Sequence, residues 1–126
     1  MHVVLLSVFG GIGCALRVTV RDAARRRGHA PWSTICMINL FGSAAIGMVL
    51  AMAKVRGDGS PHAVSAAVGV LAGWTTYSAF AMDVVQLWLR GDRARAAVIW
   101  MATMFGSPML AWAGAWAVRA SLGGGS

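Results

Sequence analysis

Three long stretches of the chain contain no charged side chain, and they limit what it can fold into. They cover residues 28–53, 59–82 and 96–118. A helix needs roughly 20 apolar residues to cross the hydrocarbon core of a bilayer, and each stretch reaches that length. Charged residues make up only 12% of the 126 residues, too few to cover the surface of a small water-soluble domain. We therefore predict an integral membrane protein rather than a soluble enzyme or a nucleic-acid-binding module.

A fourth apolar segment opens the chain and spans a bilayer only if it continues through Arg17 to about Val20. A cleaved signal peptide is the alternative for this segment, but no Lys or Arg precedes its apolar part. The prediction is thus an all-α membrane protein. Its four transmembrane helices are expected at about residues 2–20, 33–53, 62–89 and 94–118.

The breaks between these helices contain residues that begin helices or form turns. Pro31 and Pro61 suit the first turn of a helix, and Gly91 suits a tight turn. We expect one transmembrane domain over residues 1–119. A flexible tail is expected at 120–126, because it ends in the low-complexity sequence Gly-Gly-Gly-Ser.

The Lys and Arg residues are unevenly divided between the two sides of the membrane. With four spans, the first and third loops lie on one side, and the second loop and both termini lie on the other. Leaving out Arg17, the first side carries seven of these residues and the second carries three. The seven are Arg21, Arg25, Arg26, Arg27, Arg90, Arg93 and Arg95, and the three are Lys54, Arg56 and Arg119. The positive-inside rule then places the seven in the cytoplasm and both termini outside.

Polar residues inside the spans are few, and such residues mark functional positions because they are costly in a membrane. Asn39 lies in the second span, and Thr103 and Ser107 lie four residues apart in the fourth. A polar block begins at Thr75 in the third span, two residues after Gly73. We predict a helix break there, near the bilayer midplane. A continuous helix whose threonine hydroxyls bond to carbonyls one turn back is the alternative.

The chain offers little that points to catalysis. Cys14 and Cys36 lie inside apolar stretches and have neither disulfide nor metal-site spacing. No nucleophile–base pair or cluster of metal ligands stands out in the sequence. We therefore do not expect an enzyme.

The polar block resembles the signature of a known family. Residues 73–80, Gly-Trp-Thr-Thr-Tyr-Ser-Ala-Phe, are similar to the G-x-T-T-F-S-T-F motif of the Fluc (CrcB) fluoride channels. Further similarities follow in the family's order: Gly10, Gly13 and Arg17 in the first helix, Asn39 to Ser43 in the second, and Gly106 and Ser107 in the fourth.

The resemblance implies a four-helix subunit of an antiparallel dimer that exports fluoride passively across a bacterial plasma membrane. It also implies a structural sodium ion at the dimer centre, held by the main-chain carbonyls of Ala72 and Thr75. Gly73, Thr76 and Ser78 are implied to form the helix break. The implied fluoride path comprises Asn39, Tyr77, Phe80, Thr103, Ser107 and Arg17.

These residue types suit fluoride, which holds its water tightly and needs other hydrogen-bond donors in exchange. Amide and hydroxyl groups are such donors, and the edge of an aromatic ring carries partial positive charge. Two positions depart from the family motif: Tyr77 replaces a phenylalanine and Ala79 replaces a threonine. A non-conducting structural subunit is therefore one alternative. A small multidrug-type antiporter is a weaker one, because residues 1–20 contain no carboxylate.

The uneven distribution of Lys and Arg between the two sides of the membrane indicates which kind of subunit completes the dimer. An antiparallel homodimer requires chains that insert in both orientations, whereas seven against three favours one orientation. We therefore expect a dimer with a paralogous subunit of opposite orientation, with a homodimer as the alternative. Fluoride and membrane lipid are the other expected partners, and no nucleic acid is expected.

Overall fold

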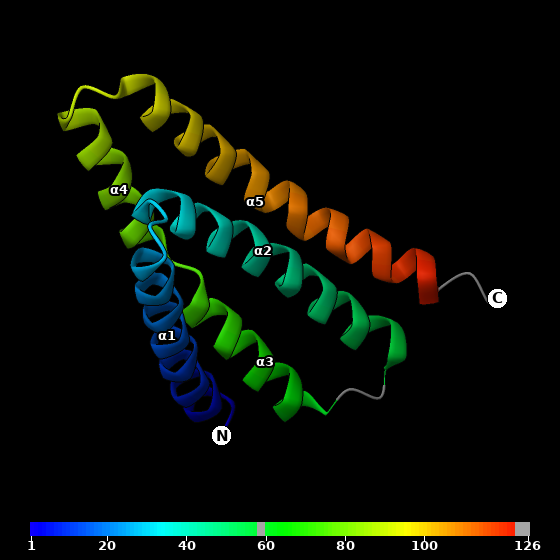
Figure 1. Ribbon diagram of the computed structural model, residues 1–126. Helices are drawn as coiled ribbons and strands as arrows, with labels where there is room; N and C mark the ends of the chain where they lie inside the picture. The colour runs from blue at the N-terminus through cyan, green and yellow to red at the C-terminus, as the bar shows by residue number, and fades with distance from the viewer. Residues whose placement is uncertain (58–59, 123–126) are drawn as a thin grey trace.

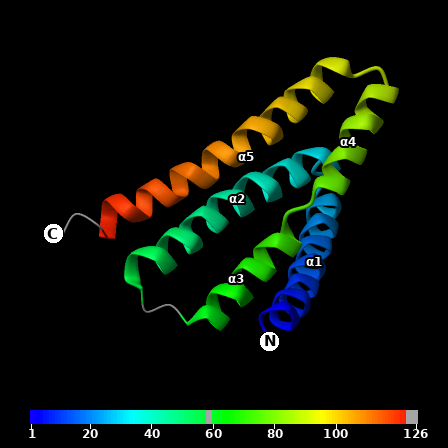
Figure 2. The ribbon, with the colours of Figure 1, turned by 180° about the vertical axis from the view of Figure 1, so that it is seen from behind.

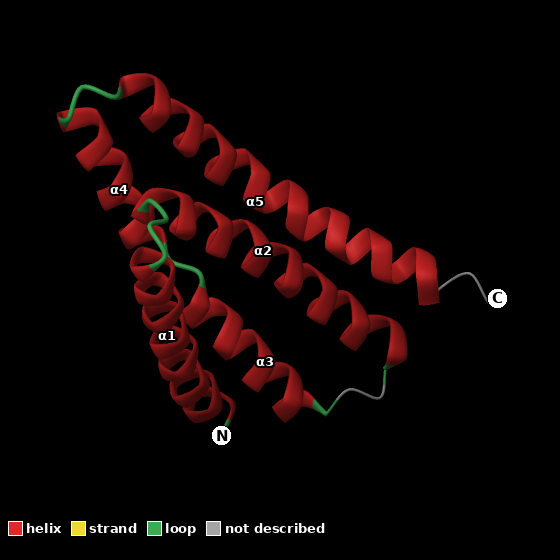
Figure 3. Ribbon diagram, in the orientation of Figure 1, coloured by secondary structure: helices red, strands yellow, loops and turns green. Residues whose placement is uncertain are grey.

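The computed structural model describes residues 1–57 and 60–122, and all regular structure in these ranges is helical (Figures 1 and 3). The helices are α1 (His2–Arg26), α2 (Pro31–Arg56), α3 (Pro61–Trp74), α4 (Tyr77–Leu89) and α5 (Arg93–Leu122). α3 and α4 follow each other as two parts of one span, so four segments are long and apolar enough to cross a membrane. This confirms the predicted all-α membrane fold with its interrupted third span. The antiparallel dimer stays a prediction.

Three helices extend further than predicted, and α2 is one of them, since it covers Pro31–Arg56 instead of about 33–53. α1 continues to Arg26 instead of ending near residue 20. α5 continues to Leu122, so the prediction of a flexible tail from residue 120 was wrong for residues 120–122. Hydropathy shows where a chain leaves the hydrocarbon, but a helix continues beyond that point, and basic residues in its last turn interact favourably with its dipole. The remainder of the predicted tail, residues 123–126, lies outside the described residues.

The helix ends follow the chemistry of Pro and Gly. α2 and α3 each begin with a proline, whose missing N–H would have had no partner in the first turn. α2 is capped by Gly57, which has a φ of 64°, and the turn before α5 contains Gly91 with a φ of 83°. Residues with a side chain rarely adopt these left-handed conformations.

The helices pack most extensively in two pairs, α1 with α3 and α2 with α5, and both views of the ribbon show these pairs side by side (Figures 1 and 2). Glycines allow the main chains to touch. A Cβ atom on Gly13 would overlap the carbonyl oxygen of Val70, and one on Gly73 would overlap that of Gly10. Small residues at such contacts are typical of helices that associate in membranes.

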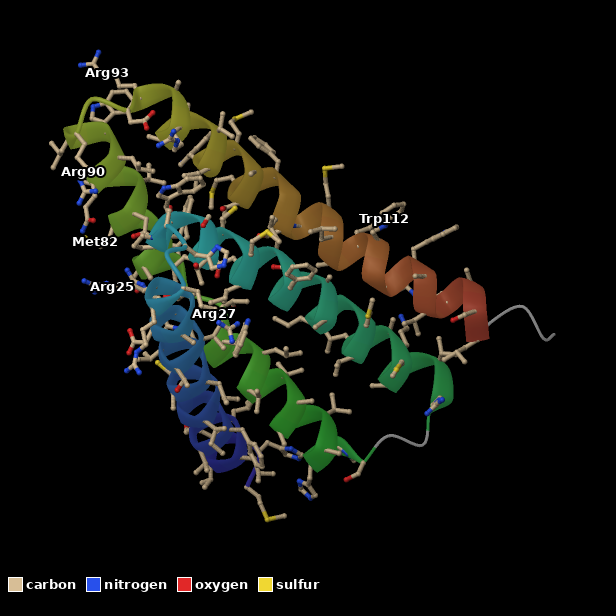
Figure 4. All side chains as sticks on the ribbon, viewed as in Figure 1. Arg25, Arg27, Met82, Arg90, Arg93 and Trp112 are labelled. Carbon is tan, nitrogen blue, oxygen red and sulfur yellow. The ribbon has the colours of Figure 1, made fainter. Side chains whose placement is uncertain are left out.

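The buried core lies where α2, α4 and α5 meet. Its largest fully buried side chains are Ile35 and Phe80. Elsewhere large apolar side chains point outwards, such as Trp112 on α5, which projects away from the bundle in Figure 4. A surface of this kind suits contact with lipid or with another membrane protein.

Candidate functional site

The third span is interrupted at two residues in an extended conformation. α3 ends at Trp74 and α4 begins at Tyr77. Thr75 has φ and ψ of −76° and 147°, and Thr76 has −153° and 122°. The peptide groups around these residues therefore leave the helical hydrogen-bond pattern and need other partners, because a membrane supplies no water.

Asn39 of α2 provides partners for the main chain of Thr76. The amide Nδ2 of Asn39 donates to the carbonyl oxygen of Thr76 at 3.2 Å, and the N–H of Thr76 donates to Oδ1 of Asn39 at 2.9 Å. Asn39 is only 5% exposed. Its side chain thus takes the place of a neighbouring peptide group and holds the break against α2.

The break releases main-chain oxygens. In a continuous helix the carbonyl of Ala72 would accept from the N–H of Thr76, but that N–H bonds to Asn39 instead. Within the described residues, the one group that donates to the Ala72 oxygen is the hydroxyl of Thr75, at 3.3 Å. The carbonyl of Thr75 accepts no hydrogen bond in that same part of the chain. Two hard oxygen atoms are therefore available at the break for a cation.

A polar hollow of about 250 Å³ opens beside the break. It is lined by Asn39, Ser43, Thr75, Thr76, Tyr77, Thr103, Met104, Ser107 and Pro108. Five of the residues that the sequence singled out as path or sodium-site residues thus share one hollow: Asn39, Thr75, Tyr77, Thr103 and Ser107. Three helices contribute to it, together with the break.

The α5 side of the hollow carries polar atoms with few partners. The hydroxyl oxygen of Ser107 is buried and has no hydrogen-bond partner within the described residues. The hydroxyl of Thr103 lies 3.6 Å from Sγ of Cys36, a weak acceptor. Pro108 lies inside α5 without ending it, and because it has no N–H, the carbonyl of Met104 loses its usual helical partner. This side can therefore offer a donor and an acceptor to a ligand.

The two aromatic residues predicted for the path are placed differently. Tyr77 is 67% exposed and lines the hollow, whereas Phe80 is 1% exposed and belongs to the core. Their rings meet edge to face with centroids 5.6 Å apart. In the single subunit, Phe80 therefore supports Tyr77 and does not line the hollow.

Of the remaining predicted residues, Thr76 also lines the hollow, whereas Arg17, Gly73 and Ser78 lie outside it. Arg17 is on α1, where its Nη2 lies 2.8 Å from Sγ of Cys14. Gly73 packs against α1. The hydroxyls of Thr76, in the break, and Ser78, at the start of α4, lie 3.2 Å apart. Gly73 thus belongs to the contact between α3 and α1.

A second polar site was missed by the sequence analysis. Arg21 of α1 lies 3.7 Å from the carboxylate of Asp83 on α4, next to a hollow of about 300 Å³ that Ser78 and Gln86 also line. Asp83 is buried, and its second oxygen, Oδ2, has no hydrogen-bond partner within the described residues. A carboxylate in an apolar span needs a cationic partner, so Asp83 itself was the signal for this pair.

The usual metal-binding side chains do not cluster in the part of the chain that the structure describes. No group of three or more His, Cys, Asp or Glu side chains comes together there. A cation at the break would thus depend on main-chain and hydroxyl oxygens, which suit hard monovalent and divalent ions.

Comparison with known proteins agrees with this architecture. Residues 4–115 match the family model described as "CrcB-like protein, Camphor Resistance (CrcB)". The chain is 36% identical to the "Fluoride-specific ion channel FluC" of Chelativorans sp. over 96% of this chain and 98% of the relative. It is 35% identical to the protein of the same name from Mesorhizobium japonicum, over 94% and 96% of the two chains. A "Fluoride-specific ion channel FluC 2" from Nitrobacter hamburgensis is 37% identical over 78% of this chain and 81% of its own.

Proposed function

Because the chain belongs to the CrcB family of multi-pass membrane proteins, we propose that it is a subunit of a channel that conducts fluoride. The observation that carries the proposal is the polar hollow next to the break, whose wall includes the Asn39 amide that holds Thr76. The names of the relatives support the choice of ion.

The chemistry of the hollow suits a small anion that must lose part of its water. Hydroxyl and amide donors of Asn39, Thr103 and Ser107 line it, and no carboxylate does. The hydroxyl of Ser107 bonds to no other group in the described part of the chain, so it need not break another bond to bind an ion. Several weak donors in series favour passage over trapping.

The direction of transport follows from passive conduction. A channel without an energy source lets fluoride leave the cytoplasm whenever the cytoplasmic activity is the higher one. We place this chain in a bacterial plasma membrane with both termini outside, because the more basic side then faces the cytoplasm.

A sodium ion is the proposed occupant of the oxygen atoms at the break. The carbonyls of Ala72 and Thr75 fit this role because neither is used by a main-chain N–H within the described residues. When bound, the ion supplies a fixed positive charge near the bilayer midplane. One chain offers few ligands for a cation, so the site is complete only if a second subunit adds its own carbonyls.

The proposed assembly is an antiparallel dimer with a paralogous chain of opposite orientation. The hollow is open in the single chain, and the exposed Tyr77 on its rim suits contact with a second subunit. The uneven charge division argues against dual insertion of one chain. A relative named FluC 2 supports the existence of paralogues in this family. A homodimer is the alternative assembly.

A non-conducting structural subunit is the second candidate function. The observation that favours it is Tyr77, whose hydroxyl-bearing ring lines the hollow where the family motif has a phenylalanine. In such a dimer the partner chain would carry the conducting pore.

Fluoride efflux from liposomes tests these proposals. We expect efflux when this chain is reconstituted together with its paralogous partner, and little when it is reconstituted alone. Efflux from this chain alone would support the homodimer. Absence of efflux in both preparations, with a folded dimer present, would reject the channel proposal. If fluoride efflux from the dimer persists after the residues that line the hollow of this chain are substituted, the structural role is favoured.

A further inference from the structure

A second groove, about 310 Å³ in volume, lies between α1 and α2 beside the basic end of α1. It does not include Asn39 or the break residues Thr75 and Thr76. Its lining is polar at the loop, where His29, Ser33 and Thr34 lie, and apolar further along α2 towards Phe41 and Trp74.

The groove has the dimensions and polarity of an acyl-chain site. Ser33 and Phe41 are eight residues apart on α2, which corresponds to about 12 Å along a helix axis. The hydroxyls of Ser33 and Thr34 donate to the carbonyl of Ala30, at 2.8 and 3.3 Å. The polar end thus lies at the start of α2, and a ligand that fits the groove is charged or polar at one end and apolar along its length.

The charge next to the polar end is positive. Arg25 and Arg26 are the last residues of α1, and Arg27 follows as its cap. The ion pairs within the described residues join Arg21 to Asp83 and Arg95 to Asp92, and neither uses these three arginines. Figure 4 shows Arg25 and Arg27 projecting to opposite sides of the end of α1. Although Asp22 lies one turn earlier on α1, a ligand headgroup at this position meets three arginines that form no ion pair within the described residues.

We propose that this groove binds an anionic phospholipid, with one acyl chain along α2 and the phosphate beside the arginines at the end of α1. Basic pockets between membrane helices recognise such headgroups by charge. A second copy of this chain is a poorer occupant. The chain carries a net charge of +7 and the opposite end of the bundle is also basic through Lys54, Arg56 and Arg119, so a copy in either orientation adds positive charge.

Quenching of tryptophan fluorescence by brominated lipids tests the site, because Trp74 lines the groove. The purified protein is reconstituted in phosphatidylcholine vesicles that contain brominated phosphatidylglycerol, or brominated phosphatidylcholine as the neutral probe. The Trp74 signal is the difference between the chain and its Trp74→Phe variant. Native mass spectrometry counts retained phosphatidylglycerol as a second readout that does not depend on that variant.

We expect stronger quenching of Trp74 by the anionic probe than by the neutral one. The double variant Arg25→Gln/Arg27→Gln should weaken this preference by about fivefold or more. Lys54→Gln/Arg56→Gln removes equal charge at the other end and should leave it unchanged. Ala24→Phe fills the groove without altering charge and should abolish it, whereas Ala113→Phe on exposed α5 should not.

Three results would overturn the proposal. The first is equal quenching by both probes. The second is an equal loss of the preference for the anionic probe in Arg25→Gln/Arg27→Gln and in Lys54→Gln/Arg56→Gln. That result would indicate diffuse attraction to the bilayer. The third is a Trp74 that neither lipid quenches in the assembled dimer, which indicates that a protein subunit covers the groove.

Discussion

The side chain of Asn39 holds the main chain of Thr76 by two hydrogen bonds, one donated and one accepted. This pair links the second span to the break in the third. The same residues line the polar hollow, so the geometry of the hollow depends on a contact between a side chain and a distant peptide group.

Replacement of Asn39 by Asp should keep one of these two hydrogen bonds and remove the other. Aspartate still accepts from the N–H of Thr76, but its carboxylate cannot donate and faces the Thr76 carbonyl. We expect a loss of about 1–3 kcal/mol in stability, because a buried carbonyl loses its donor. Unfolding in mixed detergent micelles measures this loss, and Asn39→Ala should cost at least as much. Wild-type stability in both variants would show that the contact is not structural.

The loss of stability caused by replacing a glycine of α1 with alanine should depend on which atoms lie near the added Cβ. Gly13→Ala brings a methyl group into the carbonyl of Val70, and we expect a loss of about 1–3 kcal/mol from the forced separation of α1 and α3. Gly11→Ala is the matched control, because no atom lies within 4 Å of its added Cβ. It should be neutral or slightly stabilising, since Ala favours helices. Equal effects at the two sites would contradict this packing of α1 on α3.

The longer of the two ion pairs, Arg21–Asp83, should stabilise the fold more than the shorter one, Arg95–Asp92. Arg95 and Asp92 lie 2.8 Å apart but are exposed, so Asp92→Asn should cost less than about 1 kcal/mol. Arg21 and Asp83 lie 3.7 Å apart, with Asp83 buried, so Arg21→Gln leaves a buried carboxylate unpaired. We expect about 1–3 kcal/mol for that change, a value reduced from that of a fully buried pair because Arg21 is partly exposed.

A double-mutant cycle with Arg21→Gln and Asp83→Asn provides the control for this comparison. If the two groups act as a pair, the double variant should be more stable than the sum of the single losses predicts. Additive losses would mean that Arg21 and Asp83 do not interact.

Tyr77→Phe should raise the rate of fluoride efflux by a few fold. The change keeps the ring that meets Phe80 edge to face and removes only the hydroxyl from the hollow. Efflux followed with a fluoride electrode measures the effect in the assembly that conducts. A lower rate would instead assign the hydroxyl a part in binding the ion.

The sequence could predict the spans and the break because each has a local cause. The charge-free stretches have the length of a span, and a glycine followed by hydroxyl residues at 73–78 favours a break. The sequence could not predict that α1 continues to Arg26, because a helix outside the hydrocarbon carries no hydropathy signal. That extra length includes Arg21, whose pairing with Asp83 was therefore missed.

The orientation of side chains at the break was also beyond the sequence. Tyr77 and Phe80 lie three residues apart on α4, yet one is exposed and the other is buried. Which of them faces the hollow depends on how α4 packs against α2 and α5. The meeting of Asn39 and Thr76 likewise depends on tertiary packing, since 37 residues separate them along the chain.

Whether fluoride passes through the hollow beside Asn39 is tested most directly by paired hydroxyl deletions. Ser107→Ala removes a buried hydroxyl of the hollow that has no partner among residues 1–57 and 60–122. Ser7→Ala removes one that donates to the carbonyl of Val3 in its own helix. Fluoride efflux from liposomes is measured for both in the conducting assembly. We predict a rate about tenfold lower for Ser107→Ala and unchanged for Ser7→Ala, as expected for the loss of about 1.4 kcal/mol of ion stabilisation. Equal rates in the two variants would contradict passage through the hollow.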